Sequence, residues 1–164
     1  MRVGLAALFW ITLTPSIWAA GLPDVIDQVR PSVVGVGTAY PPRQPNIKGN
    51  PVEYRATGFV VGNGRQVVTN AHVIPKKLDV ENKQRLAIFV GRGAEARVYS
   101  ASVVRIDEEH DLALLSVEGV KLPAMTLGDS DTVREGQEIA FTGFPIGMVL
   151  GLYPVTHRGI VAAI

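Results

Sequence analysis

His72 is the residue whose type and position point most clearly to chemistry. It lies near the end of the segment VVTNAHVI at 67–74, which follows the apolar segment TGFVV at 57–61. The two segments meet at GNG, 62–64, where glycine and asparagine supply the positive φ of a tight hairpin. A histidine that closes a strand lies at the rim of a sheet, with one imidazole edge toward solvent and the other toward the protein. This placement suits a general base, although a lone histidine is more often structural and needs a partner.

The candidate partner is Asp111, which directly precedes the strand-like run LALLSV at 112–117. Its carboxylate therefore stands where the chain enters the core. A buried carboxylate needs hydrogen-bond donors, and the Nδ1–H of a histidine can be one of them. An aspartate before a strand is, by itself, usually a turn residue. The two residues become candidate catalytic residues only if the fold brings them together.

Ser130 is a weaker candidate for a nucleophile. In the triplet Gly128-Asp129-Ser130 the serine is followed by Asp131 and Thr132, whereas a nucleophilic serine would need paired glycines there to form the sharp turn that presents its Oγ. Ser130 also lies only 19 positions after Asp111, which leaves too few residues for strands that would carry the chain to a separate nucleophile loop. We therefore predict that Ser130 is a turn residue.

A metal site is also disfavoured. On paper, a zinc ion could use the nitrogen and oxygen atoms of His72, Glu108, Glu109, His110 and Asp111. These residues lack helical ligand spacing, and His110 and Asp111 would face opposite sides if the strand has already begun. With no cysteine in the chain, thiolate sites and thiol nucleophiles are excluded. We expect no metal and no cofactor, and we expect His157, in a predicted strand, to be a surface residue.

The elements that would position these residues are mainly strands. Apolar residues at helical spacing predict a short amphipathic helix over 22–30, which Pro31 ends. The proline-rich stretch 41–53 predicts an exposed loop. Runs of β-branched residues between turn residues predict an all-β barrel or sandwich, with strands at 32–40, 56–61, 65–69, 86–90, 96–106 and 112–117.

The N-terminus limits the location of the protein. Met1 and Arg2 precede an apolar run and the small residues Ala19 and Ala20, the layout of a secretory signal peptide, here over residues 1–19. The alternative is an uncleaved anchor, but the apolar stretch is short for a spanning helix.

The charge balance of the chain limits its partners. Lysine and arginine total 16 against 15 acidic residues in 164. This balance provides no electrostatic footprint for nucleic acid or anionic lipid.

Several motifs in order give the chain a family resemblance. TGFVV, VVTNAHVI, DLALLSV, LGDSD and VTHRGIVAAI together resemble the trypsin-like serine peptidases, in particular the HtrA/Deg group. The resemblance implies a chymotrypsin-type fold of two antiparallel β-barrels, with the first barrel over 22–122 and the start of the second over 123–164. It also implies that His72 is the general base, that Asp111 orients it, and that the substrates are polypeptides. The signal peptide and the resemblance together predict a periplasmic or extracellular protein with no stable membrane anchor, and homo-oligomers occur in the family.

The chain departs from the family pattern at its C-terminal end. No GNSGG-like segment occurs before Ile164, although chymotrypsin-type chains carry their serine nucleophile in such a loop of the second barrel. One hypothesis is a serine endopeptidase whose nucleophile lies beyond Ile164. The other is a catalytically inactive pseudo-peptidase that binds polypeptides or completes a partner. The apolar segment GIVAAI at 159–164, expected as a last strand with an open edge, favours the first.

Overall fold

The computed structural model describes residues 21–41, 52–145 and 152–164, and within them the fold is mostly β with one α-helix. Six antiparallel strands close into a barrel in the order β1-β2-β3-β6-β5-β4. They are β1 (Val33–Ala39), β2 (Val52–Val61), β3 (Gln66–Thr69), β4 (Arg85–Val90), β5 (Arg97–Asp107) and β6 (Leu112–Val117). The all-β prediction is confirmed, and of the two architectures left open by the strand pattern the barrel is the one present.

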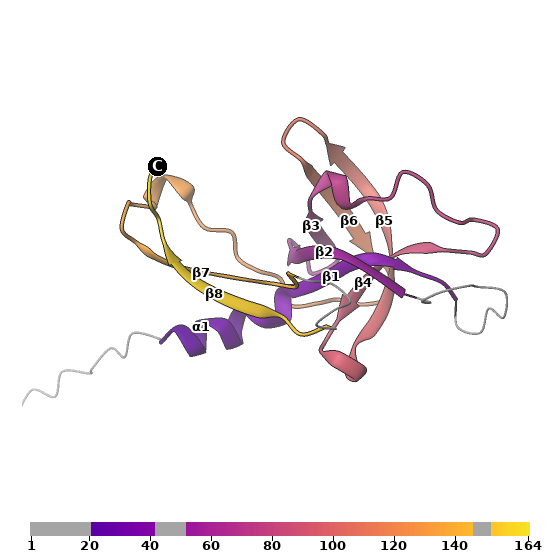
Figure 1. Cartoon of the computed structure of the whole chain (residues 1–164), viewed down its shortest axis with the longest axis horizontal. Helices are drawn as coiled ribbons and strands as arrows, with labels where there is room; N and C mark the ends of the chain where they lie inside the picture. Colours follow the sequence, from indigo (N-terminus) through magenta and orange to yellow (C-terminus); the bar gives the residue numbers. More distant parts are fainter. Residues whose placement is uncertain (1–20, 42–51, 146–151) are drawn as a thin grey trace, which may run out of the picture.

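Two further strands form a separate sheet. β7 (Glu138–Gly143) and β8 (Val155–Ile160) pair antiparallel, and Figure 1 shows them beside the helix α1 (Leu22–Val29), away from the barrel strands. The division into 22–122 and 123–164 stays a prediction. The expected signal peptide, residues 1–19, lies outside the described residues. Within the described ranges no helix has both the length and the apolar character needed to cross a bilayer.

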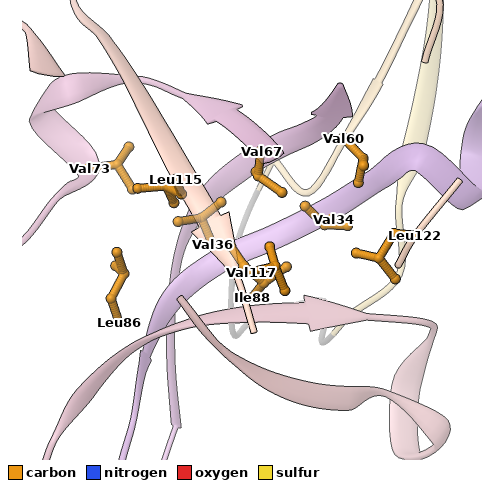
Figure 2. Packing of buried hydrophobic residues seen from close by; sticks show 10 residues of the cluster. All are labelled: Val34, Val36, Val60, Val67, Val73, Leu86, Ile88, Leu115, Val117 and Leu122. Carbon is orange, nitrogen blue, oxygen red and sulfur yellow. The ribbon is translucent and has the colours of Figure 1, made fainter. Parts of the chain in front are cut away.

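The barrel interior is filled by branched aliphatic side chains that alternate along the strands. Figure 2 shows ten of these residues packed together inside the barrel. The alternation places one side chain in two toward the interior. The largest of them that are fully buried include Ile88 and Leu115. One member, Val73, comes from the turn after β3 and anchors that turn to the core.

A second apolar cluster joins the outer face of the barrel to the segments around the small sheet. Ala87 and Phe89 of β4 pack with Phe144, which follows β7, and with Leu152, which precedes β8. The backbone N–H of Phe144 also donates to Thr57 Oγ1 at 2.8 Å. Because this cluster covers its outer face, β1 is buried along its whole length. The small sheet is thereby tied to the barrel.

Three element boundaries expected from the sequence need correction. The stretch 41–53 is not loop throughout, because β2 begins at Val52, where it pairs with Ala39 of β1. The last strand does not span 159–164: β8 ends at Ile160 because it pairs with Glu138, the first residue of β7. Pro31 ends the α-helix, but the chain continues as a 3-10 turn over Arg30–Ser32, since a proline in the first turn of such a segment needs no N–H bond.

The hairpin between β2 and β3 forms largely as predicted. Gly62 and Gly64 adopt φ of 60° and 84°, which glycine accepts without steric cost. Asn63 is not among the residues with positive φ, contrary to expectation. Its side chain instead accepts a hydrogen bond from the Arg65 N–H at 3.0 Å, as asparagine does in many turns. The tight turn sets the register that carries β3 toward His72.

Candidate functional site

The site lies at one end of the barrel, where two neighbouring strands leave the sheet. β3 and β6 pair antiparallel, and their last paired residues at this end are Thr69 and Ala113. His72 follows β3 and Asp111 precedes β6, so the antiparallel register brings both to the same rim. The sequence predicted this rim position for His72, and the pairing of β3 with β6 explains how its partner arrives there.

The turn that carries His72 is fixed on both sides. Asn70 is extended, and Ala71–Val73 form a 3-10 turn in which the Ile74 N–H donates to Ala71 O at 3.0 Å. The side chain of Val73 is buried in the barrel core, whereas the His72 side chain is 71% exposed. The buried neighbour thus holds the backbone while the imidazole remains accessible to a reacting group.

The carboxylate of Asp111 is bonded to both the backbone and the ring of His72. Asp111 Oδ1 accepts the His72 N–H at 2.9 Å, and Asp111 Oδ2 lies 2.7 Å from His72 Nδ1. The second distance is inside the range for a hydrogen bond between a catalytic base and its partner. The two predicted site residues are therefore in direct contact, whereas their catalytic roles stay predictions.

This contact sets the chemistry available to the imidazole. An ionised carboxylate only accepts, so the neutral ring must carry its proton on Nδ1 and leave Nε2 as the basic nitrogen. Nε2 is then able to take a proton from a hydroxyl group. The carboxylate also favours the imidazolium that such a transfer creates. The arrangement can act as a general base of the kind that activates a nucleophile.

Asn70 is a site residue that the sequence analysis missed. Its Nδ2 donates to the backbone carbonyl and to Oδ2 of Asp111, both at 3.2 Å. Ala71 N–H donates to the same carbonyl at 3.1 Å. Asn70 therefore fixes the side chain of Asp111 relative to its own backbone carbonyl. Its position two residues before His72 was the only feature of the sequence that pointed to Asn70. Because asparagine is common in turns at strand ends, this position did not distinguish a site residue from a turn residue.

Asp111 departs from the prediction in one respect. Its side chain is 44% exposed rather than buried. It still receives the donors that were expected of a buried carboxylate, and the backbone N–H of His72, followed by the His72 ring, lowers the pKa of Asp111 below its usual value. The hydrogen bonds from His72 thus stabilise the ionised carboxylate, whereas its partial burial opposes ionisation.

The lowered pKa of Asp111 predicts acid sensitivity of the fold. A carboxyl group whose pKa is lower in the folded than in the unfolded state stabilises the fold at pH values above its unfolded pKa, which is about 3.9 for aspartate. This stabilisation is lost as the pH falls through the folded pKa. We expect the free energy of unfolding to fall less steeply with pH in this acid range for Asp111→Asn than for wild type. Urea unfolding at a series of pH values measures both slopes; equal slopes would contradict the prediction.

The remaining candidate residues lie apart from this contact. Ser130 begins a 3-10 turn, as predicted for a turn serine, and Asp129 caps it by accepting from the Asp131 N–H. His157 lies on the exposed surface of β8 and stacks on Phe141 with ring centroids 5.2 Å apart. In the part of the chain that the structure describes, no three histidine or acidic side chains gather as a metal-binding group.

His110 differs from the expected geometry. It was expected on a strand, facing away from Asp111, but β6 begins only at Leu112. The hairpin pairing ends at Asp107 and Leu112, so residues 108–111 form the connecting turn. The ring of His110 turns back to Asp107, with Nδ1 3.0 Å from Oδ2.

Comparison with known proteins supports a specific family. The family model "Trypsin-like peptidase domain" matches residues 56–164. The chain is 31% identical to Serine protease HTR4 of Bos taurus over 84% of this chain and 28% of the relative. It is 34% identical to the Probable periplasmic serine endoprotease DegP-like of Halomonas elongata over 65% of this chain and 21% of the relative. The chain thus spans less than a third of either relative.

A solved structure shares the fold. The crystal structure of the MamO protease domain from Magnetospirillum magneticum, in its apo form, aligns with a TM-score of 0.59 and 26% identity. The alignment covers 83% of this chain and 62% of that chain. Over most of its length, this chain therefore shares its fold with a known protease domain.

Proposed function

Since this chain belongs to the trypsin-like serine peptidases and is similar to HtrA and DegP-like proteases, we propose that it carries two of the three catalytic residues of an exported serine endopeptidase. His72 is the general base, and Asp111 orients it. The observation that carries the proposal is the 2.7 Å contact between His72 Nδ1 and Asp111 Oδ2. The serine nucleophile belongs to a segment that follows Ile164.

The proposed reaction is hydrolysis of a peptide bond through an acyl-enzyme. The serine Oγ attacks the scissile carbonyl carbon while His72 Nε2 takes the hydroxyl proton. The His72 imidazolium then gives that proton to the leaving amine. Water attacks the ester in the second half of the reaction, again with His72 as base. Asp111 keeps the proton on Nδ1 and stabilises the imidazolium without becoming protonated itself.

The substrates and location of the protein follow from the same proposal. Polypeptides are the substrates, and residues 1–19 direct export to the periplasm or the exterior. The name of the Halomonas elongata relative, a probable periplasmic endoprotease, supports this location. Assembly of several copies is a further part of the proposal, with the HtrA resemblance as its support. The proposal includes no cofactor.

An apolar groove supports a second candidate function. A groove of about 650 Å³ is lined in part by Leu22 and Val25 of α1, Phe59 of β2, Leu127, which precedes β7, and Ile139 of β7. Grooves of this size with apolar walls bind ligands in many proteins. The alternative is therefore a polypeptide-binding module with no catalysis of its own. Sequencing the gene past the codon for Ile164 separates the two: an open frame with a GNSGG-like segment supports the peptidase, and an immediate stop supports the binding module.

The proposal predicts that residues 20–164 alone do not turn over casein. A triad without its nucleophile retains only the ~10³–10⁴-fold contribution of substrate binding and the oxyanion hole, and this chain also lacks the GNSGG-like loop that supplies that hole. The assay compares this protein with its His72→Ala variant. Equal traces of cleavage in both indicate a contaminating peptidase. Cleavage that disappears in His72→Ala would contradict the proposal that the nucleophile lies beyond Ile164.

A further inference from the structure

A second histidine–aspartate pair lies in the turn that delivers Asp111. Asp107, the last residue of β5, accepts the backbone N–H of His110 at 3.0 Å through Oδ1. Its two carboxylate oxygens also lie 3.1 and 3.0 Å from His110 Nδ1. The mechanism proposed above uses neither residue. Their position directly before Asp111 suggests a role in presenting it.

The turn between β5 and β6 has an unusual backbone conformation at the residue that matters. Asp111 has a φ of 53°, in the left-handed region that side chains other than glycine rarely adopt. Its N–H donates to Glu108 O at 3.4 Å, which is a long bond for holding such a conformation. A residue keeps a conformation of this kind only where its surroundings determine it. Other contacts must therefore hold Asp111 in place.

Hydrogen bonds on both sides of Asp111 along the chain hold this residue in place. On its C-terminal side, the Ala71 N–H and Asn70 Nδ2 donate to the carbonyl oxygen of Asp111. On its N-terminal side, Asp107 accepts the backbone N–H of His110, the residue immediately before Asp111. The first set ties Asp111 to the segment of His72, and the second ties the same turn to the end of β5.

We propose that Asp107 is a positioning residue for the His72–Asp111 pair: by accepting the backbone N–H of His110 it holds the turn 107–111 in the conformation that presents Asp111 to His72. This inference rests on the proposed peptidase function. Asp107 acts through the backbone, and its negative charge is not what the role requires.

The chemistry of an aspartate fits this role. One short carboxylate can accept the backbone N–H and the ring Nδ1–H of His110 at the same time. The backbone N–H of His110 is also the largest of the causes that lower the pKa of Asp107, because this bond stabilises the ionised carboxylate. The His110 ring is 66% exposed, and water can replace it as a donor. The backbone bond is therefore the part of the contact that the turn needs.

Two substitutions at Asp107 separate a geometric role from an electrostatic one. Asparagine keeps the length of the side chain and an acceptor oxygen but loses the charge. Glutamate keeps the charge but adds a methylene group, which moves the acceptor away from the His110 N–H. In the full-length enzyme, meaning this chain with the segment that follows it in its gene, we expect Asp107→Asn to retain most of kcat. We expect Asp107→Glu and Asp107→Ala to lower kcat by about 10²-fold with little change in KM, because a displacement of about 1 Å can cost this much.

Two variants of the same turn serve as controls. Glu108→Ala removes a neighbouring negative charge, and His110→Ala removes the ring but leaves the backbone N–H that Asp107 binds. Both are expected to keep most of kcat. The opposite order at Asp107, with kcat retained in Asp107→Glu and lost in Asp107→Asn, would overturn the proposal in favour of a charge effect. Wild-type kcat in all the Asp107 variants would overturn it altogether.

A second readout does not depend on peptidase activity. The pKa of the Asp111 carboxyl, followed by carbon-13 NMR in the 164-residue chain, reports its contact with His72, since the hydrogen bonds from His72 lower it. We expect this pKa to rise in Asp107→Glu and to stay low in Asp107→Asn. If the full-length enzyme cleaves no peptide, the peptidase proposal fails while this titration still decides the role of Asp107. An Asp111 pKa that stays low in folded Asp107→Glu would overturn the positioning role.

Discussion

If the proposed function holds, replacing His72 by alanine is expected to lower kcat of the full-length enzyme by about 10⁶-fold, the loss that follows removal of the base from a serine peptidase triad. Alanine leaves no group that can take the serine proton as the oxygen attacks. The ring is 71% exposed, so its loss removes little packing and the fold is expected to remain. Casein hydrolysis and circular dichroism of the same preparation measure the two effects separately.

The matched control for His72→Ala is Ser130→Ala. Ser130 is exposed in a 3-10 turn, and the Asp129 cap accepts the N–H of Asp131, not the Ser130 hydroxyl. Its replacement should leave kcat almost unchanged. A loss on Ser130→Ala as large as that on His72→Ala would show that Ser130 is the nucleophile and that the segment after Ile164 does not supply it.

Replacing Asp111 by asparagine is expected to lower kcat by about 10⁴-fold, the loss known for the equivalent change in a serine peptidase triad. The asparagine has nearly the same shape, but it can present an N–H to His72 Nδ1. The ring then carries its proton on Nε2 and cannot accept one from the serine. Substrate binding does not use Asp111, so KM should change little. Steady-state kinetics on one peptide substrate provides both constants.

The outcome for Asp111→Asn also distinguishes the two ways in which this residue binds His72. The variant keeps an oxygen that can accept the His72 N–H, the contact that Asp111 Oδ1 makes at 2.9 Å. The backbone of the site should therefore remain in place. If kcat were nearly unchanged, the contact at Nδ1 would be structural and the general-base role of His72 would lose its support.

The barrel could be predicted from the sequence because its strands are marked by strong local signals. β-branched runs bounded by glycine, asparagine or aspartate located all six strands, and the pairing in the structure closes them into one barrel. The start of β2 was missed because Val52–Arg55 directly follows a proline-rich stretch, although its residues alternate between apolar and polar as they do in a strand. The pairing of Val52 with Ala39 that makes it a strand depends on β1, which lies elsewhere in the sequence.

The site was predictable in its residue types but not in its full geometry. His72 and Asp111 stood out because each adjoins a strongly apolar strand, and the register of β3 with β6 brings them together. The left-handed φ of Asp111 and the contact of Asp107 with His110 had no such signal, since aspartates in turns are common. Asn70 was missed for the same reason. These residues acquire a role only through the partners that the fold places beside them.

The central claim is that His72 and Asp111, rather than the neighbouring pair of His110 and Asp107, form the catalytic pair. Its most direct test is kcat of His110→Ala measured beside kcat of His72→Ala and Asp111→Asn in the full-length enzyme. The structure predicts that His110→Ala keeps most of kcat, because its ring faces Asp107 and its backbone N–H is unaffected, whereas the other two variants lose nearly all of it. If His110→Ala were as damaging as His72→Ala while Asp111→Asn was tolerated, the assignment of the catalytic pair would be wrong.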